Sequence, residues 1–295
     1  MHRKAKPLLR DVREAVDLAE RIYQLGKRIL SDAFPKVHAV KIPSCRGSYF
    51  QRGEDGEIWN KYKRLCKNGN VSCVKTLMLH GPTGHGKEYS AANLMNQLYR
   101  NKNKLKNLRA PRPAILWTIN AKSQATMLDS YCSLAEEIGL TEEAKVANQE
   151  LSLLSRTSEG RQYQINLKNQ CQKNAYDEAL NQIYEKVMKK LRHYSPWVLL
   201  IKGLSEDMPS RFWPQPGDPN VGNGLVVITT QYSKLLAKEG GDHCLEKVFI
   251  GKMKNEDAVK LLADKSGIPA IGADKTYAQD IAVKKLMRVP QDIAK

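Results

Sequence analysis

The segment that most constrains the fold is LMLHGPTGHGKEYSAANLM, residues 77–95. It places Gly81, Gly86 and Lys87 in the spacing G-x-x-x-x-G-K, after an apolar run and before a helical pattern. In that order, glycines let backbone N–H groups turn inward around phosphate oxygens, and the helix start and the lysine add positive charge. The context predicts a phosphate-binding loop rather than a plain turn with a surface lysine. Its candidate nucleotide-binding residues are Gly81, Pro82, Thr83, Gly84, His85, Gly86, Lys87, Glu88 and Tyr89.

The rest of the chain alternates short apolar runs with helical patterns. The apolar runs do not alternate with polar residues, as expected for strands covered on both faces. Strands separated by helices predict an α/β fold, a three-layer P-loop NTPase with a parallel sheet, followed by a small, partial α-helical domain. The predicted strands are 76–80, 114–119, 197–201, 225–230 and 247–250, and the predicted helices are 88–99, 123–138, 166–192 and 231–238.

The chain divides into four predicted parts. Residues 1–35 have the pattern of amphipathic helices, and 36–47 contain two prolines and indicate a linker. Residues 48–250 form the predicted nucleotide-binding α/β domain, and 251–295 are helical only. Because this last pattern stops before it is complete, we expect the chain to be a fragment of a longer protein.

Two positions that normally organise Mg²⁺ carry unusual residues. Glu88 stands where a serine or threonine hydroxyl would bind the metal, and the strand 197–201 leads into Lys202 where an aspartate is expected. Both side chains converge on the metal in this fold, so we expect them to approach each other and an ion pair to replace the cation. The alternative is loss of function at both positions, and either interpretation weakens Mg²⁺-dependent hydrolysis. Glu206 and Asp207 follow the strand and are weak candidates for orienting water or holding Mg²⁺, with solvated loop carboxylates as the alternative.

Composition limits the partners. The formal net charge of +17 allows nucleic-acid binding, but the basic residues are not interleaved with aromatic ones, so this stays a secondary hypothesis. The six cysteines include no C-x-x-C pair, which argues against a metal site and favours reduced thiols. No apolar run approaches the ~20 residues that span a bilayer. We expect a cytoplasmic protein without a membrane partner.

The order of the motifs resembles the NB-ARC module of STAND signalling ATPases, the nucleotide switch of apoptosome proteins and plant immune receptors. The matching segments are YFQRGEDGEIWNKYKRL, AILWTINAKSQATMLDSYCSLAEEIGL, WVLLIKGLSEDMPSRFWPQPG, GNGLVVITTQ, GKMKNEDAVKLLADKSGI and LMRVPQDIAK. The resemblance implies that Phe50, Gln51 and Arg52 lie near the adenine and that Pro290 packs near the base. It also implies protein partners bound through flanking modules, and self-oligomerisation.

The chain departs from the family pattern at its metal and γ-phosphate positions. Besides Glu88 and the degenerate Walker B residue Lys202, Gln231 stands where the family usually has a sensor arginine. The retained groups serve the diphosphate and the base, which implies a site that holds ADP or ATP with doubtful Mg²⁺ and little or no hydrolysis. We expect a regulatory nucleotide-binding switch or scaffold, a pseudo-NTPase of apoptotic or innate immune signalling. The alternatives are an active P-loop ATPase and a basic nucleic-acid-binding protein.

Overall fold

The computed structural model describes residues 39–43, 51–67, 73–100, 113–156, 165–236, 243–266 and 280–281, with side chains described outside 150–156 and 165–173. Contacts divide the chain into residues 1–38 and 39–295, and only the second unit contains described residues. Phe50 and Pro290, two of the predicted site residues, lie outside the described residues, as do the predicted N-terminal helices.

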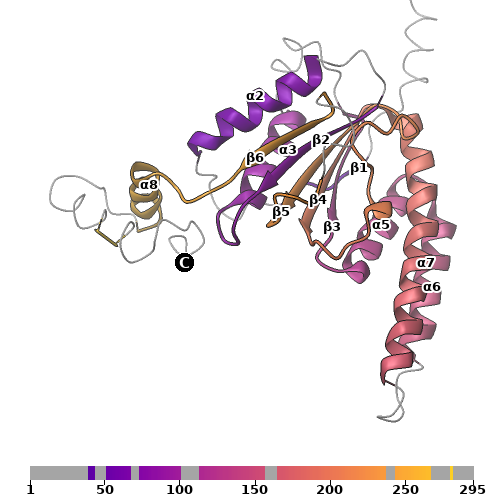
Figure 1. Ribbon diagram of the computed structural model, residues 1–295. Coiled ribbons are helices and arrows are strands. Elements are labelled where there is room, and N and C mark those ends of the chain that lie inside the picture. Colours follow the sequence, from indigo (N-terminus) through magenta and orange to yellow (C-terminus); the bar gives the residue numbers. More distant parts are fainter. Residues whose placement is uncertain are drawn as a thin grey trace, which may run out of the picture. The chain divides into compact units, whose positions relative to one another are not determined.

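A parallel sheet forms the centre of the described unit (Figure 1). Its order is β1-β3-β4-β5-β2-β6, so β5 lies between the strand that precedes the phosphate loop and the strand that ends near Lys202. The strands are β1 (Ala39–Val40), β2 (Val74–His80), β3 (Ile115–Asn120), β4 (Trp197–Leu204), β5 (Gly224–Thr230) and β6 (Leu245–Phe249). Every pairing is parallel. The five strands expected from the apolar runs are therefore confirmed, and the two-residue β1 lies where a linker was expected.

Helices cover both faces of the sheet, which gives three layers. The helices are α2 (Gly53–Lys67), α3 (Lys87–Arg100), α5 (Gln124–Glu137), α6 (Thr141–Arg156), α7 (Ile165–Leu191) and α8 (Asn255–Ser266). Alternate residues of β2, β3, β4 and β5 bury against opposite layers. Leu77 and Leu79 of β2 pack with α2 and α3, whereas Met78 packs with α5 and α7. The predicted P-loop α/β fold is confirmed, because this arrangement carries the glycine loop between a central strand and a helix on one face.

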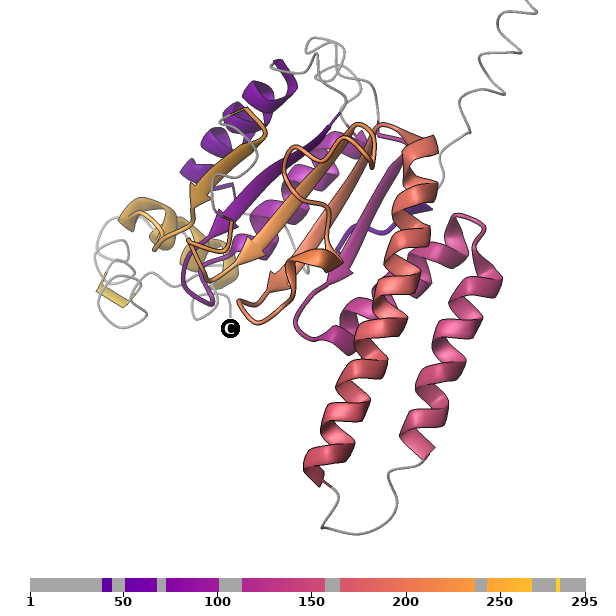
Figure 2. The same ribbon diagram turned by 45° about the vertical axis from the view of Figure 1, so that its right-hand side comes forward.

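The long crossover between β3 and β4 forms a helical layer of its own. A capping box at Ser123 and Thr126 starts α5, which packs on the sheet. In Figure 2, α6 and α7 run side by side and continue beyond the sheet edge. The helices predicted over 123–138 and 166–192 correspond to α5 and α7, and α6 lies between them.

The predicted helix over 231–238 is wrong for its described part, because residues 231–236 form turns. Lys247 of β6 explains this difference. Its ammonium donates to the carbonyl oxygens of Ser233 at 3.2 Å and Leu236 at 2.7 Å. These tertiary hydrogen bonds satisfy carbonyls in a segment too short to stabilise a helix by itself.

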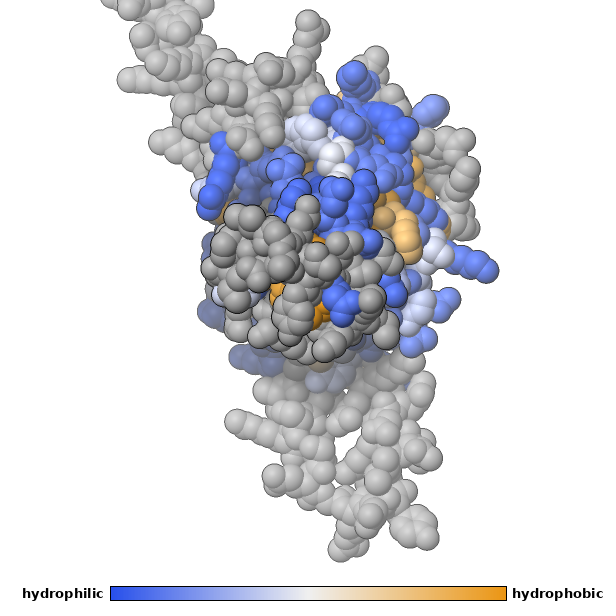
Figure 3. Space-filling view, turned by 90° about the vertical axis from the view of Figure 1, so that its left-hand side faces the viewer, coloured by the Kyte–Doolittle hydropathy of each residue, from blue (hydrophilic) through white to orange (hydrophobic). Residues whose placement is uncertain are grey.

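The edge strand β6 is covered by charged side chains of α2. Lys61 donates to the Lys247 carbonyl and forms an ion pair with Glu57 at 3.2 Å. Arg64 forms an ion pair with Glu246 of β6 at 3.2 Å. Figure 3 looks onto the side of the molecule where α2 and α8 lie, and the described residues there are mostly hydrophilic. Charged groups at an edge hinder pairing with a further strand. None of the described helices is long and apolar enough to cross a membrane.

Candidate functional site

The glycine loop joins the carboxyl end of β2 to the first turn of α3. Three of its glycines have positive φ angles, 145° at Gly81, 79° at Gly84 and 85° at Gly86. Residues with a side chain rarely adopt positive φ angles, so these positions depend on glycine. Successive turns of this kind orient backbone N–H groups toward an anion, and the N-terminus of α3 adds its positive end. The glycine conformations of the loop are therefore of the kind found where backbone N–H groups turn toward an anion.

The linker after β6 runs against the start of the loop. The Ile250 N–H donates to the His80 carbonyl at 2.7 Å. A Cβ atom added to Gly81 would lie 2.2 Å from the Ile250 carbonyl oxygen. The loop and the linker that leads to α8 are therefore packed together. Only glycine allows two backbone segments to approach this closely.

Lys87 is turned toward its own loop. Its ammonium donates to the carbonyl oxygens of Gly81 at 2.7 Å and Pro82 at 2.6 Å, and only 8% of the residue is exposed. Burial lowers the pKa of Lys87, although the neighbouring Glu88 carboxylate opposes the shift. The loop thus holds a partly desolvated positive charge at its base.

Glu88 and Lys202 form an ion pair, as expected from the sequence. The Lys202 ammonium lies 2.7 Å from a Glu88 carboxylate oxygen. The two side chains come from α3 and β4 and are 43% and 30% exposed, respectively. β4 is held in place here because the Lys202 carbonyl accepts from Ala121 at 2.8 Å and the Gly203 N–H donates to the Thr229 hydroxyl at 2.9 Å. The two positions that would organise a metal are therefore occupied by a charge pair.

The other predicted polar residues lie at the same edge of the sheet. Gln231 is exposed directly after β5, and Glu206 and Asp207 are exposed in the turn after β4. Tyr89 is half exposed on the first turn of α3. Within the described part of the chain, no three His, Cys, Asp or Glu side chains gather to hold a metal ion.

His85 is buried within the loop, 7% exposed, although nothing in its sequence context distinguishes it from an exposed loop residue. Its ring Nδ1 lies 2.8 Å from the Thr83 carbonyl oxygen. The His85 ring thus stabilises the loop from within. The His85 carbonyl accepts a hydrogen bond from a residue outside the loop.

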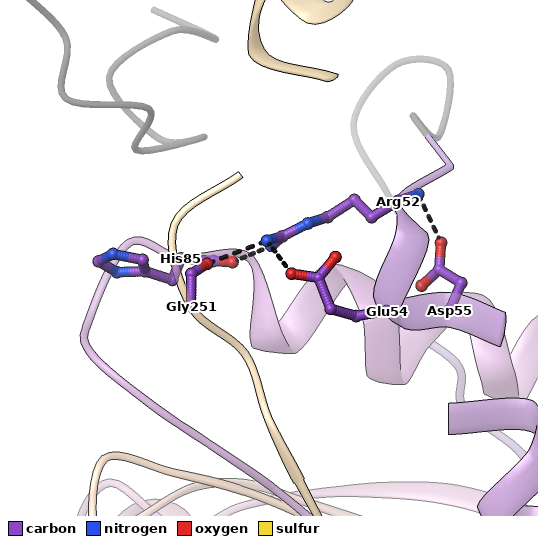
Figure 4. A network of polar contacts seen from close by, with 5 residues as sticks. All are labelled: Arg52, Glu54, Asp55, His85 and Gly251. Carbon is purple, nitrogen blue, oxygen red and sulfur yellow. Dashed lines mark hydrogen bonds and ion pairs between the residues drawn. The ribbon is translucent and has the colours of Figure 1, made fainter. Parts of the chain in front are cut away.

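That residue is Arg52, which the family resemblance implies lies near the adenine. Its guanidinium donates to the His85 carbonyl, to Glu54 at 2.9 Å and to the Gly251 carbonyl at 3.0 Å (Figure 4). The Arg52 side chain is 5% exposed. The residue also precedes α2, where its backbone N–H donates to Asp55 at 2.8 Å and caps the helix. Arg52 therefore connects the start of α2, the phosphate loop and the linker after β6.

Comparisons with known proteins add little to this geometry. No protein-family model and no curated protein matches the chain. Among the solved structures that match is the crystal structure of the FIGL-1 AAA domain in complex with ADP. It has a TM-score of 0.41 and 12% sequence identity, over 91% of this chain and 76% of that chain. At this level of similarity, the bound ADP is a property of that protein alone.

Proposed function

We propose that the chain is a nucleotide-binding regulatory switch or scaffold that holds ADP at the loop Gly81–Lys87 and hydrolyses ATP little or not at all. The observation that carries the proposal is the Lys202–Glu88 ion pair, 2.7 Å long. It occupies the two positions from which a P-loop enzyme binds Mg²⁺, while the glycines and the lysine that serve the phosphates are retained.

Charge explains why the pair suits a diphosphate better than a reacting triphosphate. An unpaired Glu88 about 5 Å from a phosphate charge would cost about 3 kcal/mol at an effective dielectric near ~20. Lys202 offsets this cost because it neutralises the carboxylate. Its single charge, already paired, does not replace a divalent cation that bridges the β- and γ-phosphates and stabilises the charge that develops during transfer. Binding is therefore retained while hydrolysis is weakened.

The switch part of the proposal depends on the linker beside the loop. Ile250 contacts the loop directly, and Gly251 is connected to it through Arg52. Helix α8 begins four residues after Gly251, at Asn255. Nucleotide bound in the loop would bias the position of this linker and of the helices that follow it. The order of motifs supports an NB-ARC type of switch, with signalling proteins bound through flanking modules and self-association as its output.

Isothermal titration of ADP and ATP, each with Mg²⁺ and with EDTA, tests the proposal. We expect ADP to bind with an affinity that Mg²⁺ does not change, and ATP turnover to be absent or very slow. Absence of ADP binding would favour loss of function at the site over replacement of the metal. ATP turnover that Lys87→Ala abolishes, with Glu88 and Lys202 intact, would contradict the inactive-site proposal and favour an active ATPase.

A further inference from the structure

The contacts of Arg52 point to a role that its sequence context did not indicate. Its buried guanidinium makes hydrogen bonds to three segments, and two of its acceptors are backbone carbonyls, those of His85 and Gly251. The third acceptor is the carboxylate of Glu54. In Figure 4 these acceptors gather around the end of the Arg52 side chain, while the His85 ring points away from it. The planar guanidinium presents its donors in a fixed fork, so these bonds fix the relative positions of the carbonyls.

The bond to the His85 carbonyl has a consequence for the next N–H group. In a trans peptide the C=O and N–H of one unit point in opposite directions. The His85–Gly86 peptide is such a unit, so when its carbonyl is held by Arg52 the Gly86 N–H points away from Arg52. Gly86, with a φ of 85°, directly precedes α3, which begins at Lys87. Arg52 thus holds the carbonyl side of a peptide whose N–H lies at the N-terminal end of α3, where an anion is favoured.

The bond to the Gly251 carbonyl connects the same guanidinium to the linker. The linker already touches the other end of the loop, where Ile250 approaches Gly81. It is therefore attached to the loop at two points, by a backbone contact at Gly81 and through Arg52 at His85. A shift of the His85–Gly86 peptide on phosphate binding would be transmitted to Gly251 through one rigid, buried group.

We propose that Arg52 is a positioning residue that orients the Gly86 amide toward the nucleotide phosphate and couples that amide to the linker carrying α8. This proposal rests on the proposed function, because it names the group that connects the bound nucleotide to the linker and α8. It assigns Arg52 to the loop and the linker, whereas the family resemblance implies only that Arg52 lies near the adenine.

The binding of three ligands distinguishes positioning of the Gly86 amide from a direct contact with adenine. We would measure ADP, pyrophosphate and adenosine binding to the full chain by displacement of a fluorescent ADP analogue, in the wild type and in Arg52→Ala. An amide that loses its orientation weakens a hydrogen bond to a charged group, so we expect ADP and pyrophosphate affinities to fall by the same factor, roughly ten- to a hundred-fold, with adenosine unchanged. Loss of ADP and adenosine affinity with unchanged pyrophosphate affinity would overturn the proposal in favour of a base contact. Unchanged affinity for all three ligands would overturn it too.

Two further variants control for charge and folding. Arg64→Ala removes a positive charge from α2, the helix that Arg52 precedes, but leaves the loop contacts intact, since Arg64 is paired with Glu246. It should keep wild-type affinities. Arg52→Lys keeps the charge and the buried stem, but its compact ammonium does not span the three acceptors. We expect it to fold and still to lose affinity for ADP and pyrophosphate together, which keeps the proposal testable if Arg52→Ala unfolds.

Hydrogen exchange without ligand gives a test that is independent of nucleotide binding. We expect Arg52→Lys to speed amide exchange in residues 81–86 and in 250–253 together, while Arg64→Ala changes neither. If the wild type binds no ADP but these segments loosen together, the proposed function fails and the coupling through Arg52 stands. If exchange in the loop is unchanged in Arg52→Lys, the coupling is wrong whatever the ligand results are.

Discussion

The phosphate side and the metal side of the site are built from different parts of the chain. The phosphate side, Gly81–Lys87, is made of backbone groups in conformations that glycine allows, and its lysine is buried. The metal side consists of the side chains of Glu88, Lys202 and Gln231, all partly or largely exposed. A side chain at an exposed position can be exchanged without disturbing the fold, whereas a glycine packed against backbone cannot. The glycine loop can therefore keep its conformation while the residues at the metal positions change.

The largest expected effect is the loss of stability on replacing Gly81 in the phosphate loop. In Gly81→Ala the new Cβ would meet the Ile250 carbonyl oxygen at 2.2 Å in a backbone conformation that alanine disfavours. We expect a loss of stability of about 3–5 kcal/mol, the range of severe backbone and packing conflicts. Thermal unfolding measures it. The matched control is Gly56→Ala in α2, where nothing lies within 4 Å and alanine should stabilise the helix by up to ~1 kcal/mol. Equal melting temperatures for the two variants would contradict the role assigned to the linker.

Next in size is the effect of unpairing the charges on the metal side. Lys202→Ala leaves Glu88 without its partner beside the bound phosphates. Because Glu88 is 43% exposed, water screens part of the repulsion, and we expect ADP affinity to fall about tenfold. Titration of ADP measures the change. The double variant Glu88→Ala/Lys202→Ala should return most of the affinity. If the double variant binds ADP as weakly as Lys202→Ala, the pair does not act as a unit.

A reciprocal change would restore the usual residue types at the two metal positions. Glu88→Thr with Lys202→Asp supplies the hydroxyl and carboxylate that Mg²⁺ accepts in P-loop enzymes. We expect ADP affinity to become several-fold higher with Mg²⁺ than with EDTA, whereas the wild type shows no difference. The ratio of the two dissociation constants is the measurement. A ratio that stays at one in the double variant indicates that further residues of the metal side are missing.

The smallest effect concerns the protonation of Lys87. Burial lowers its pKa below the ordinary 10.5, and a bound phosphate should raise it again. ADP binding should therefore take up protons in the interval between the lowered pKa and 10.5, and ADP affinity should fall as pH rises through it. For folding the sign is reversed: the unfolded chain binds the proton more tightly, so the contribution of Lys87 to stability rises with pH across this interval.

Titration in two buffers of different ionisation enthalpy, at about pH 9.5 and about pH 7, measures the proton uptake. Lys87→Ala should show no such pH-dependent uptake, and it is expected to bind ADP more weakly at both pH values. Equal uptake by the wild type and the variant would assign the proton to another group.

Much of the architecture was predictable because burial on both faces of a parallel sheet leaves a strong sequence signal. Each continuous apolar run became a strand, and the approach of Glu88 to Lys202 followed from the convergence of a helix start and a strand end in this fold. The turns at 231–236 were not predictable, because Lys247 holds them from a later strand. Nor was β1, since two residues carry no periodicity.

Five strands, the glycine loop and the approach of Glu88 to Lys202 could be inferred from the amino-acid sequence, because they depend on local spacing and on the general geometry of the fold. The contacts of Arg52 became visible only in the folded chain. Its acceptors are Glu54, two residues away, His85, 33 residues away, and Gly251, 199 residues away. No local pattern records that two distant carbonyls meet at one guanidinium, since a backbone carbonyl is present at every residue and only the folded chain selects those that lie within reach.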